Sequence, residues 1–385
     1  MITTTLGTLF AKRAGSVDPS KFPDEEFDLY SIPAYDRGSP EVLMGAEIGS
    51  TKQIVAPGDV LLSRIVPHIR RAWIVGPSHG RRIIASGEWI VFRSDVIDAR
   101  WLRHYLLADA FHAQFMQTVA GVGGSLLRAR PTQASTIQLD IPAVDDQRRI
   151  AAILDHADAL RSKQRVVAGQ LENMTQAIFI DMFGDPGRNP HGLPVGTIGD
   201  LVASADYGTS EKSAVSGDIA VLRMNNITYS GEMDLRDLKY MALPADKLER
   251  YTVRSGDVLF NRTNSAELVG KTAVYRGQSP VAYAGYLVRL RVHDQHHPDY
   301  LSSVLNSRYG KATLRGMCKS IVGMANINAK EVQTIRIPIP SSADQKLYAD
   351  RLCDLRSQQA LQTTRQLKLD ELFSSLQSRA FSGQL

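Results

Sequence analysis

The 385-residue chain contains only two cysteines, Cys318 and Cys353, and they form no CxxC pair. A structural zinc site is therefore not expected, and neither is a disulfide framework. No stretch approaches the ~18 consecutive apolar residues that a bilayer-spanning helix needs. The first ten residues mix Thr and Gly into their apolar residues and lack a basic leader, unlike a signal peptide. These absences predict a cytoplasmic protein that is not embedded in a membrane.

Motifs for catalysis are also missing. Gly270-Lys271-Thr272 supplies the end of a P-loop, but Ser265 stands where the first glycine must be. Gly121-Val122-Gly123-Gly124 is not GxGxxG and is interpreted as a flexible loop. No Asn-Pro-Pro-Tyr-like segment exists to hold a flipped adenine. We therefore expect no enzyme active site in this chain.

Two clusters of polar residues have simpler interpretations than chemistry. His293-Asp294-Gln295-His296-His297 precedes Pro298 in a polar stretch without a carboxylate-rich partner, which favours a solvated turn over a metal site. Asp145-Asp146 lies at an expected helix start, where carboxylates cap the helix and favour the positive end of its dipole. No metal is expected.

The chain repeats itself at one offset. Gly58-Asp59-Val60-Leu61-Leu62-Ser63-Arg64 recurs as Gly256-Asp257-Val258-Leu259-Phe260-Asn261-Arg262, and 256 − 58 = 198. The same offset links Ile141-Pro142 with Ile339-Pro340, Asp146-Gln147 with Asp344-Gln345, Leu154 with Leu352, Leu171 with Leu369, and Phe183 with Phe381. Such a long period excludes solenoids and propellers and predicts two tandem domains.

Each half follows the same order of segments. Short β-type runs such as Trp89-Ile90-Val91-Phe92 and Leu287-Val288-Arg289-Leu290 alternate with turn residues. An apolar segment ending in proline follows, at 137–142 and 335–340. A long charged stretch closes each half. This order predicts a mixed α+β domain followed by a long helix, twice over.

The first long stretch has a heptad pattern. Its apolar rows are Ile153, Leu160, Val167 and Met174, and Ala157, Gln164, Leu171 and Ile178. Four repeats of this pattern favour a coiled coil. Pro142 and Asp145 mark its start, and Gly184-Asp185-Pro186 its end.

The second stretch repeats Leu355, Gln362, Leu369 and Leu376, but Gln358 and Arg365 interrupt its other row. Ser342 and Gln345 fit a capping box, and Gly383 follows the end. Gln164 and Gln362 are equivalent, since 362 − 164 = 198. They either pair across a seam and fix its register, or each lies off the true seam.

Neither helix is expected to bury its apolar rows alone, so we expect the two to pair. From Asp146 to Ile180 is 35 residues, or roughly 50 Å of helix. An antiparallel pair of that length is a rigid spacer with a globular domain at each end.

Several segments resemble the specificity subunits of type I restriction–modification systems. Ile141-Pro142 with residues 146–155 (DQRRIAAILD) resembles the entry to that family's central conserved helix, and residues 179–186 (FIDMFGDP) resemble its exit. Residues 375–385 (SLQSRAFSGQL) resemble the family's last turn, and the two Gly-Asp-Val-Leu stretches resemble a strand of its target-recognition domains. The entry to the second helix, 347–351 (LYADR), departs from the usual Ile-rich pattern, which leaves its heptad phase open.

The resemblance implies a DNA-recognition protein without catalysis of its own. Each target-recognition domain would bind one half of an interrupted, asymmetric duplex site, and the paired helices would set the gap. Two methyltransferase (M) subunits that modify adenine N6 would dock on this core, and motor-nuclease (R) subunits would join to cut unmodified DNA. S-adenosylmethionine and ATP would be bound by those partners only.

Candidate DNA contacts follow from the chemistry of phosphates and base edges, which favours Arg, Lys and Asn. In the first half they are Arg64, His68, Arg70, Arg71, Arg128 and Arg130; in the second they are Asn225, Asn226, Arg262, Thr263, Asn264, Lys271 and Lys319. Arg64 and Arg262 recur at the repeat offset, which favours a shared structural or phosphate-binding role. A net charge of +5 is compatible with DNA but decides little.

The sequence thus predicts an α+β protein with four parts. Target-recognition domain 1 is expected at 1–143, the central conserved helix at 144–186, target-recognition domain 2 at 187–340 and the C-terminal conserved helix at 341–385. The alternative is a coiled-coil scaffold or regulator that binds protein and has no DNA specificity.

Overall fold

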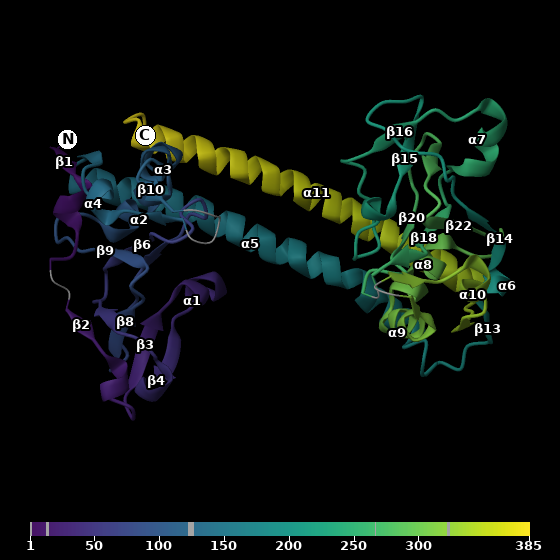
Figure 1. Ribbon diagram of the computed structural model, residues 1–385, viewed down its shortest axis with the longest axis horizontal. Coiled ribbons are helices and arrows are strands. Elements are labelled where there is room, and N and C mark those ends of the chain that lie inside the picture. The colour runs from purple at the N-terminus through teal and green to yellow at the C-terminus, as the bar shows by residue number, and fades with distance from the viewer. Residues whose placement is uncertain (1, 13–14, 122–126, 266, 322–323) are drawn as a thin grey trace. The chain divides into compact units, whose positions relative to one another are not determined.

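A computed structural model describes residues 2–12, 15–121, 127–265, 267–321 and 324–385 (Figure 1). The part of the predicted glycine loop at residues 122–124 lies outside the described residues. The chain divides into two compact units, Met1–Arg165 with Arg365–Leu385, and Val166–Thr364. We call them unit 1 and unit 2.

The described strands of unit 1 lie before residue 142, and its helices other than the short α1 lie after residue 98. Its strands are β1 (Ile2–Thr5), β2 (Ser16–Val17), β3 (Glu26–Tyr30), β4 (Glu41–Met44), β5 (Lys52–Ile54), β6 (Val60–Ser63), β7 (Ala72–Ile74), β8 (Arg82–Ala85), β9 (Trp89–Phe92), β10 (Val119–Ala120), β11 (Arg128–Ala129) and β12 (Gln138–Ile141). Its helices are α1 (Ile32–Arg37), α2 (Ala99–Leu107), α3 (Asp109–Met116), α4 (Pro131–Ala134) and the first half of α5 (Val144–Phe183), with 3₁₀ turns η1 (Leu6–Leu9), η2 (Pro19–Lys21) and η3 (Gly45–Glu47).

Unit 2 repeats this order. Its strands are β13 (Val195–Thr197), β14 (Val202–Tyr207), β15 (Ile219–Leu222), β16 (Lys239–Met241), β17 (Thr252–Val253), β18 (Val258–Asn261), β19 (Thr263–Asn264), β20 (Thr272–Val274), β21 (Val281–Tyr283), β22 (Leu287–Val292), β23 (Lys319–Ile321), β24 (Met324–Asn326) and β25 (Arg336–Pro338). Its helices are α6 (Ile198–Leu201), α7 (Ala245–Tyr251), α8 (Pro298–Asn306), α9 (Arg308–Met317), α10 (Ala329–Gln333) and the first half of α11 (Ser342–Phe381), with the 3₁₀ turn η5 (Met224–Asn226).

The sheets of the two units have matching topology. The order β7-β6-β9 in unit 1 corresponds to β20-β18-β22 in unit 2, which β14 extends. Each unit has a second sheet, which we call its outer sheet, with the order β2-β5-β8-β3-β4 in unit 1 and β16-β15-β21-β17 in unit 2. It contains one parallel pair, β3 with β8 or β15 with β21, among antiparallel neighbours. The first strand of each unit pairs antiparallel with the strand just before the long helix, β1 with β12 and β13 with β25. The duplication therefore extends from sequence to fold, and the predicted α+β class is confirmed.

Buried glutamines explain the repeated Asp-Gln at the start of each long helix. Gln147 accepts a hydrogen bond from the Asp98 backbone N–H at 2.8 Å and donates one to the Pro142 carbonyl at 2.9 Å. Gln345 makes the same two bonds, with His297 N–H and the Pro340 carbonyl. Because a buried amide must be hydrogen-bonded, each glutamine fixes the helix start against the N-terminus of α2 or α8. These bonds attach each globular domain to its long helix.

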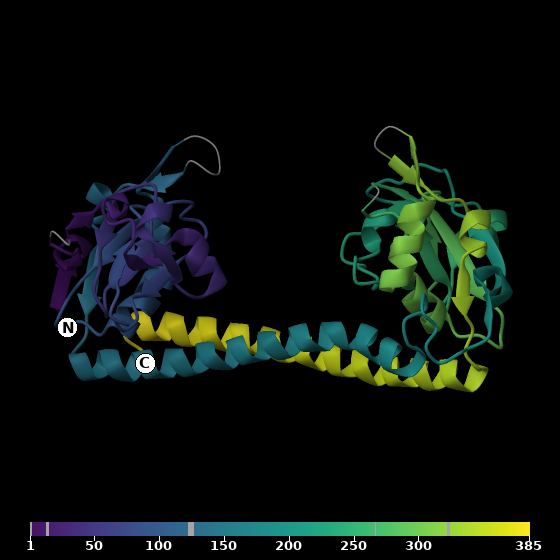
Figure 2. The same ribbon diagram turned by 90° about the horizontal axis from the view of Figure 1, so that it is seen from below.

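Apolar packing strengthens the same attachment. In unit 1 the start of α5 and the end of α11 pack beside Trp101 of α2, and Leu154 and Ala380 belong to this cluster. In unit 2 the end of α5 and the start of α11 pack beside Tyr300 of α8, through Phe179 and Tyr348. Within each unit, one helix's beginning thus lies beside the other's end, and the two run antiparallel (Figure 2).

The seam between the helices is a row of buried and half-buried residues with 3-4 spacing. On α5 they are Leu154, Ala157, Arg161, Gln164, Ala168, Leu171, Thr175, Ile178 and Met182; on α11 they are Leu352, Leu355, Gln359, Gln362, Gln366, Leu369, Phe373, Leu376 and Ala380. The two lists match residue for residue at the offset of 198. Gln164 and Gln362 both lie in these rows.

One predicted row does not lie in the seam. Leu160, Val167 and Met174 are 40%, 37% and 43% exposed, and Ile153 is half-buried, so the expectation that they line the seam is wrong. The row that does lie in the seam is one residue later and begins Leu154, Arg161. Hydrophobicity alone misplaced it, because Arg161 takes a seam position by pairing with Asp370 at 2.7 Å and stacking on Phe373 at 4.3 Å.

The capping residue predicted for the start of α11 is also wrong by one position. The hydroxyl of Ser341, not Ser342, accepts the hydrogen bond from Asp344 N–H, so the predicted capping box is shifted by one residue. Gln345 could not serve as its partner because it points into the domain. Gly184 and Gly383 have φ of 73° and 74°, as expected for glycines that end helices.

Candidate nucleic-acid interface

The repeated Gly-Asp-Val-Leu segments form equivalent strands, each held by an ion pair between a buried aspartate and a partly exposed arginine. In unit 1 Arg93 binds both carboxylate oxygens of Asp59, at 2.7 and 2.6 Å. In unit 2 Arg291 binds both oxygens of Asp257, at 2.8 and 3.2 Å. Each aspartate also accepts a backbone N–H of its own turn. The motif therefore serves the scaffold, and the residues that follow it are free to differ.

A β-hairpin lies beside the end of each repeated strand. In unit 1 the Arg64 carbonyl accepts Ala129 N–H, which joins the end of β6 to β11 of the β10–β11 hairpin. In unit 2 the Arg262 carbonyl accepts Ile327 N–H, and β19 pairs with β24 of the β23–β24 hairpin. The sequence places these segments more than 60 residues apart, as 327 − 262 shows, and the fold joins them into one site in each unit. We call these sites strand-end site 1 and strand-end site 2.

Strand-end site 1 brings together two of the predicted arginines through an acid that sequence reasoning missed. Glu88 lies 3.3 Å from Arg64 Nε and 3.1 Å from Arg128 Nη2. Burial raises the pKa of Glu88, but the hydrogen bonds and charges of Arg128 and Arg64 outweigh it and lower that pKa below the ordinary value. The carboxylate is therefore ionised at neutral pH, and the three charges sum to +1.

The other predicted DNA contacts of unit 1 differ in whether their side chains are free to bind DNA. Arg71 is buried and pairs with both oxygens of Asp36, at 2.7 and 2.9 Å, so it is structural. Arg70 pairs with Asp109 at the start of α3. His68 and Arg130 are exposed, and Arg130 directly follows β11. Arg130 is thus the cation of this set best placed to reach a phosphate beside Arg128.

The loop after β6 holds backbone strain. Val66 has φ of 48°, in the left-handed region that a β-branched residue rarely adopts. Its N–H donates to the Leu127 carbonyl, beside the β10–β11 hairpin. A strained residue persists only where the surrounding structure enforces it, and such residues cluster at functional sites.

Strand-end site 2 has a different set of side chains on the same backbone. Arg262 lies 4.9 Å from the ring of Tyr207, a cation–π contact. Thr263 is buried beside Asn326, and Asn264 is half-buried with its amide 3.6 Å from Met224 Sδ. In the part of the chain that the structure describes, no carboxylate pairs with Arg262.

Two predicted residues of unit 2 hold the loop around η5. Asn226 is buried, donates to the carbonyls of Asp234 and Asp237, and accepts Arg223 N–H. Lys271 donates to the carbonyls of Met224 and Ile227 at 3.0 and 2.6 Å, and burial lowers its pKa. Both support the loop from inside. Asn225, the residue before Asn226, is exposed, and Lys319 lies in β23.

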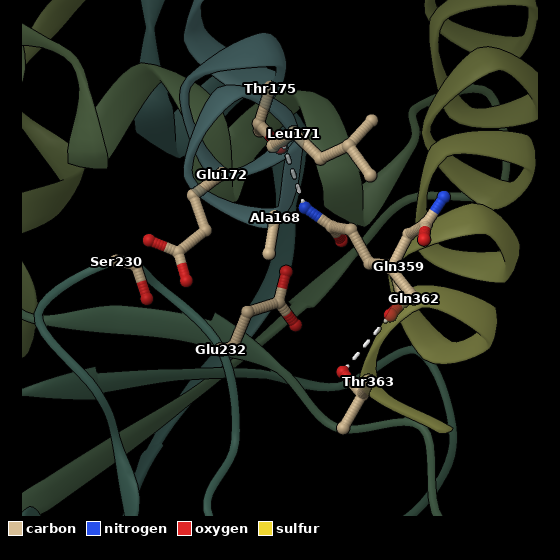
Figure 3. Close-up of a pocket in the computed structure, with 9 residues that line it drawn as sticks. All are labelled: Ala168, Leu171, Glu172, Thr175, Ser230, Glu232, Gln359, Gln362 and Thr363. Carbon is tan, nitrogen blue, oxygen red and sulfur yellow. Dashed lines mark hydrogen bonds between the residues drawn. The ribbon is translucent and has the colours of Figure 1, made fainter. Parts of the chain in front are cut away.

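A cavity in unit 2 has the wrong charge for DNA. It has a volume of about 290 Å³ and lies between α5, α11 and the Ser230–Glu232 turn (Figure 3). Glu172 and Glu232 both point toward it, beside Gln359, whose amide donates to the Leu171 carbonyl at 3.0 Å. Two carboxylates repel a phosphate, so this cavity is not part of the candidate interface.

The histidine-rich segment forms a helix start. His297 Nδ1 accepts Asp299 N–H at the N-terminus of α8, and His296 contacts Gln345 at 3.1 Å. Among the described residues, no group of three or more His, Cys, Asp or Glu could hold a metal ion. None of the described helices is long and apolar enough to cross a membrane.

Comparison with known proteins finds similarity to one family. Residues 190–371 match the type I restriction modification DNA specificity domain. The EcoKI specificity subunit of Escherichia coli K12 is 21% identical over 316 residues, 75% of this chain. The StySPI specificity subunit of Salmonella potsdam is 27% identical over 180 residues, 45% of this chain. The chain is thus similar to the specificity subunits of type I restriction–modification systems. This chain spans between 32% and 66% of the length of the curated relatives that it matches.

A solved structure shares the fold over the full length of the chain. The matched structure comes from a study of complex assembly and conformational transition of the type I R-M system. The TM-score is 0.65 at 19% identity, and the match covers 100% of this chain and 98% of the other. At this identity the match supports the arrangement of two domains and long helices, which is the predicted architecture.

Proposed function

We propose that the chain is the DNA sequence-recognition subunit of a type I restriction–modification complex. Its target-recognition domains, 1–143 and 187–340, each bind one half of an interrupted, asymmetric duplex site. The observation that carries this proposal is the pair of strand-end sites. Their backbones are equivalent, yet Glu88 and Arg128 of site 1 are replaced by Tyr286 and Asn326 in site 2. A protein that reads two different half-sites needs this combination.

The chemistry of the exposed side chains fits base and phosphate contacts. Arginine suits guanine N7 and O6, and asparagine suits adenine N6 and N7. Arg64, Arg128 and Arg130 are the candidates in site 1; Asn225, Arg262, Asn264 and Asn326 are those in site 2. Arg71, Asn226 and Lys271 are occupied by structural contacts, and we remove them from the proposed interface.

We further propose that catalysis belongs to partner subunits. Two methyltransferase (M) subunits with S-adenosylmethionine would methylate adenine N6, and motor-nuclease (R) subunits with ATP would cut unmodified sites, in the cytoplasm. The use of Lys271 within the fold supports this reading, because the lysine of the partial P-loop donates to backbone carbonyls. The exposed Leu160, Val167 and Met174 offer apolar area on α5 for a partner.

Salt-dependent DNA binding tests the proposal. The chain, co-purified with its neighbouring subunits, should bind duplex DNA with an affinity that falls steeply as salt rises, because phosphate contacts release counterions. A coiled-coil scaffold without DNA specificity would show no such dependence. Absence of salt-dependent binding would therefore contradict the proposed function.

A further inference from the structure

The two strand-end sites contain one position that differs in charge. Arg64 N–H donates to the Glu88 carbonyl and Arg262 N–H donates to the Tyr286 carbonyl, each at 3.0 Å. Since 286 − 88 = 198, these residues are equivalent in sequence as well as in backbone contacts. Unit 1 has a carboxylate there, and unit 2 has a phenol that is 52% exposed.

In unit 1 the carboxylate of Glu88 forms ion pairs with both arginines of the site. Each oxygen of Glu88 lies within 3.3 Å of a guanidinium nitrogen, from Arg64 on one side and Arg128 on the other. The three side chains are 26–40% exposed, so solvent and DNA can reach them. A phosphate that binds either arginine must share it with Glu88 and tolerate that negative charge.

In unit 2 the equivalent residue, Tyr286, has no carboxylate, so Arg262 is available to bind a phosphate. The guanidinium of Arg262 stacks on Tyr207, and the equivalent of Arg128 is the neutral Asn326, which contacts Thr263. A phosphate that binds Arg262 displaces no carboxylate among the described residues. Opposite charges a few ångströms apart attract even when they are partly exposed, so one carboxylate can change DNA affinity measurably.

We infer that the residue at this position sets how strongly each domain attracts the DNA backbone irrespective of sequence. Glu88 restrains Arg64 and Arg128, so that domain 1 binds non-target DNA weakly. Tyr286 imposes no such restraint, so that domain 2 supplies most of the sequence-independent attraction. This inference rests on the proposed function, and it concerns the division of that function between the two domains.

The test is the affinity of the full chain, co-purified with its neighbours, for a non-target duplex at several salt concentrations. Glu88→Gln should tighten binding severalfold at low salt. It should also steepen the slope of log affinity against log salt by about 0.9, the change expected for one additional phosphate contact. Between 50 and 200 mM salt, the advantage over wild type should then fall about 3.5-fold.

Two further variants make the test specific. Tyr286→Glu places a carboxylate beside Arg262 and should weaken binding and flatten the slope by a similar amount. Glu25→Gln is the matched control, because it removes the same charge from unit 1 at a residue that pairs with Arg82 on the outer sheet. It should leave the slope close to the wild-type value.

Three results would overturn the inference. These are a slope for Glu88→Gln equal to that of Glu25→Gln, weaker binding by Glu88→Gln, or tighter binding by Tyr286→Glu. If Glu88→Gln lowers the melting temperature and cannot be compared, the Tyr286→Glu variant decides alone. Absence of salt-dependent binding in the wild-type complex would instead contradict the proposed function, so the two failures are distinguishable.

Discussion

Residues that match at the offset of 198 fall into two physical classes. Asp59 and Asp257, like Gln147 and Gln345, are identical, buried and fully engaged in equivalent contacts. Glu88 and Tyr286 occupy equivalent backbone positions but differ in chemistry and are accessible to solvent. At these positions identity accompanies a scaffold role and difference accompanies the candidate interface, whereas Arg64 and Arg262 are identical at the same offset and lie in that interface. Repetition identified the first class from sequence, whereas the second needed the backbone contacts that align Glu88 with Tyr286.

The buried glutamines give a prediction for stability. Gln147→Leu leaves the Asp98 N–H and the Pro142 carbonyl without their partner, and each unsatisfied buried group costs about 1–3 kcal/mol. We expect a clear fall in the melting temperature of the variant. Gln133→Leu, at an exposed position of the same unit, is the control and should melt close to wild type. Equal melting temperatures for both variants would show that Gln147 does not anchor α5.

Lys311 gives a prediction for pH dependence. Burial, with the charges of Lys271 and Arg315, lowers the pKa of Lys311 to about 8 from its ordinary 10.5. Because folding disfavours the charged form, the stability from this group is complete above pH 10.5 and is lost as the pH falls through 8. The wild-type protein should thus gain stability from this group between pH 8 and 10.5, and Lys311→Met should lose that gain. Melting at several pH values measures it, with the exposed Lys330→Met as control; an unchanged pH profile in Lys311→Met would contradict the assignment.

Among the elements, the long helices were the most predictable and their phase the least. Their positions and glycine ends followed from composition, heptad spacing and the glycines that stop them. Their contact face did not, because the seam contains Arg161 and four glutamines, whereas Leu160 and Val167 lie outside it. A charged residue is stable in a seam when an ion pair and an aromatic ring surround it, as Asp370 and Phe373 surround Arg161. Such compensation is invisible in a hydrophobic pattern.

A pair of substitutions tests the corrected phase. Leu154 is fully buried and Leu160 is 40% exposed, in the same half of α5. Leu154→Ala should destabilise unit 1 by about 2–5 kcal/mol, because it leaves a cavity in the core. Leu160→Ala should cost no more than about 0.5 kcal/mol. Hydrogen exchange of unit 1 amides compares the two, and the reverse order of costs would restore the row that hydrophobicity suggested.

For the molecule as a whole, the sequence was sufficient to predict the duplication, the fold class and the family resemblance. It did not predict which cations are available to DNA. Arg71, Asn226 and Lys271 were reasonable candidates by residue type, yet partners distant in sequence or in the loop around η5 occupy them. The domain limits predicted at 143, 186 and 340 stay predictions, as does the assignment of cofactors to partner subunits.

The central claim is that this chain directs methylation to one bipartite sequence. The most direct measurement is single-molecule sequencing of N6-methyladenine in the native strain with and without the gene for this chain. We predict that deletion abolishes methylation of one interrupted, asymmetric motif and leaves other motifs unchanged. If every methylated motif persists in the deletion strain while the complex is expressed in the parent, the claim is contradicted.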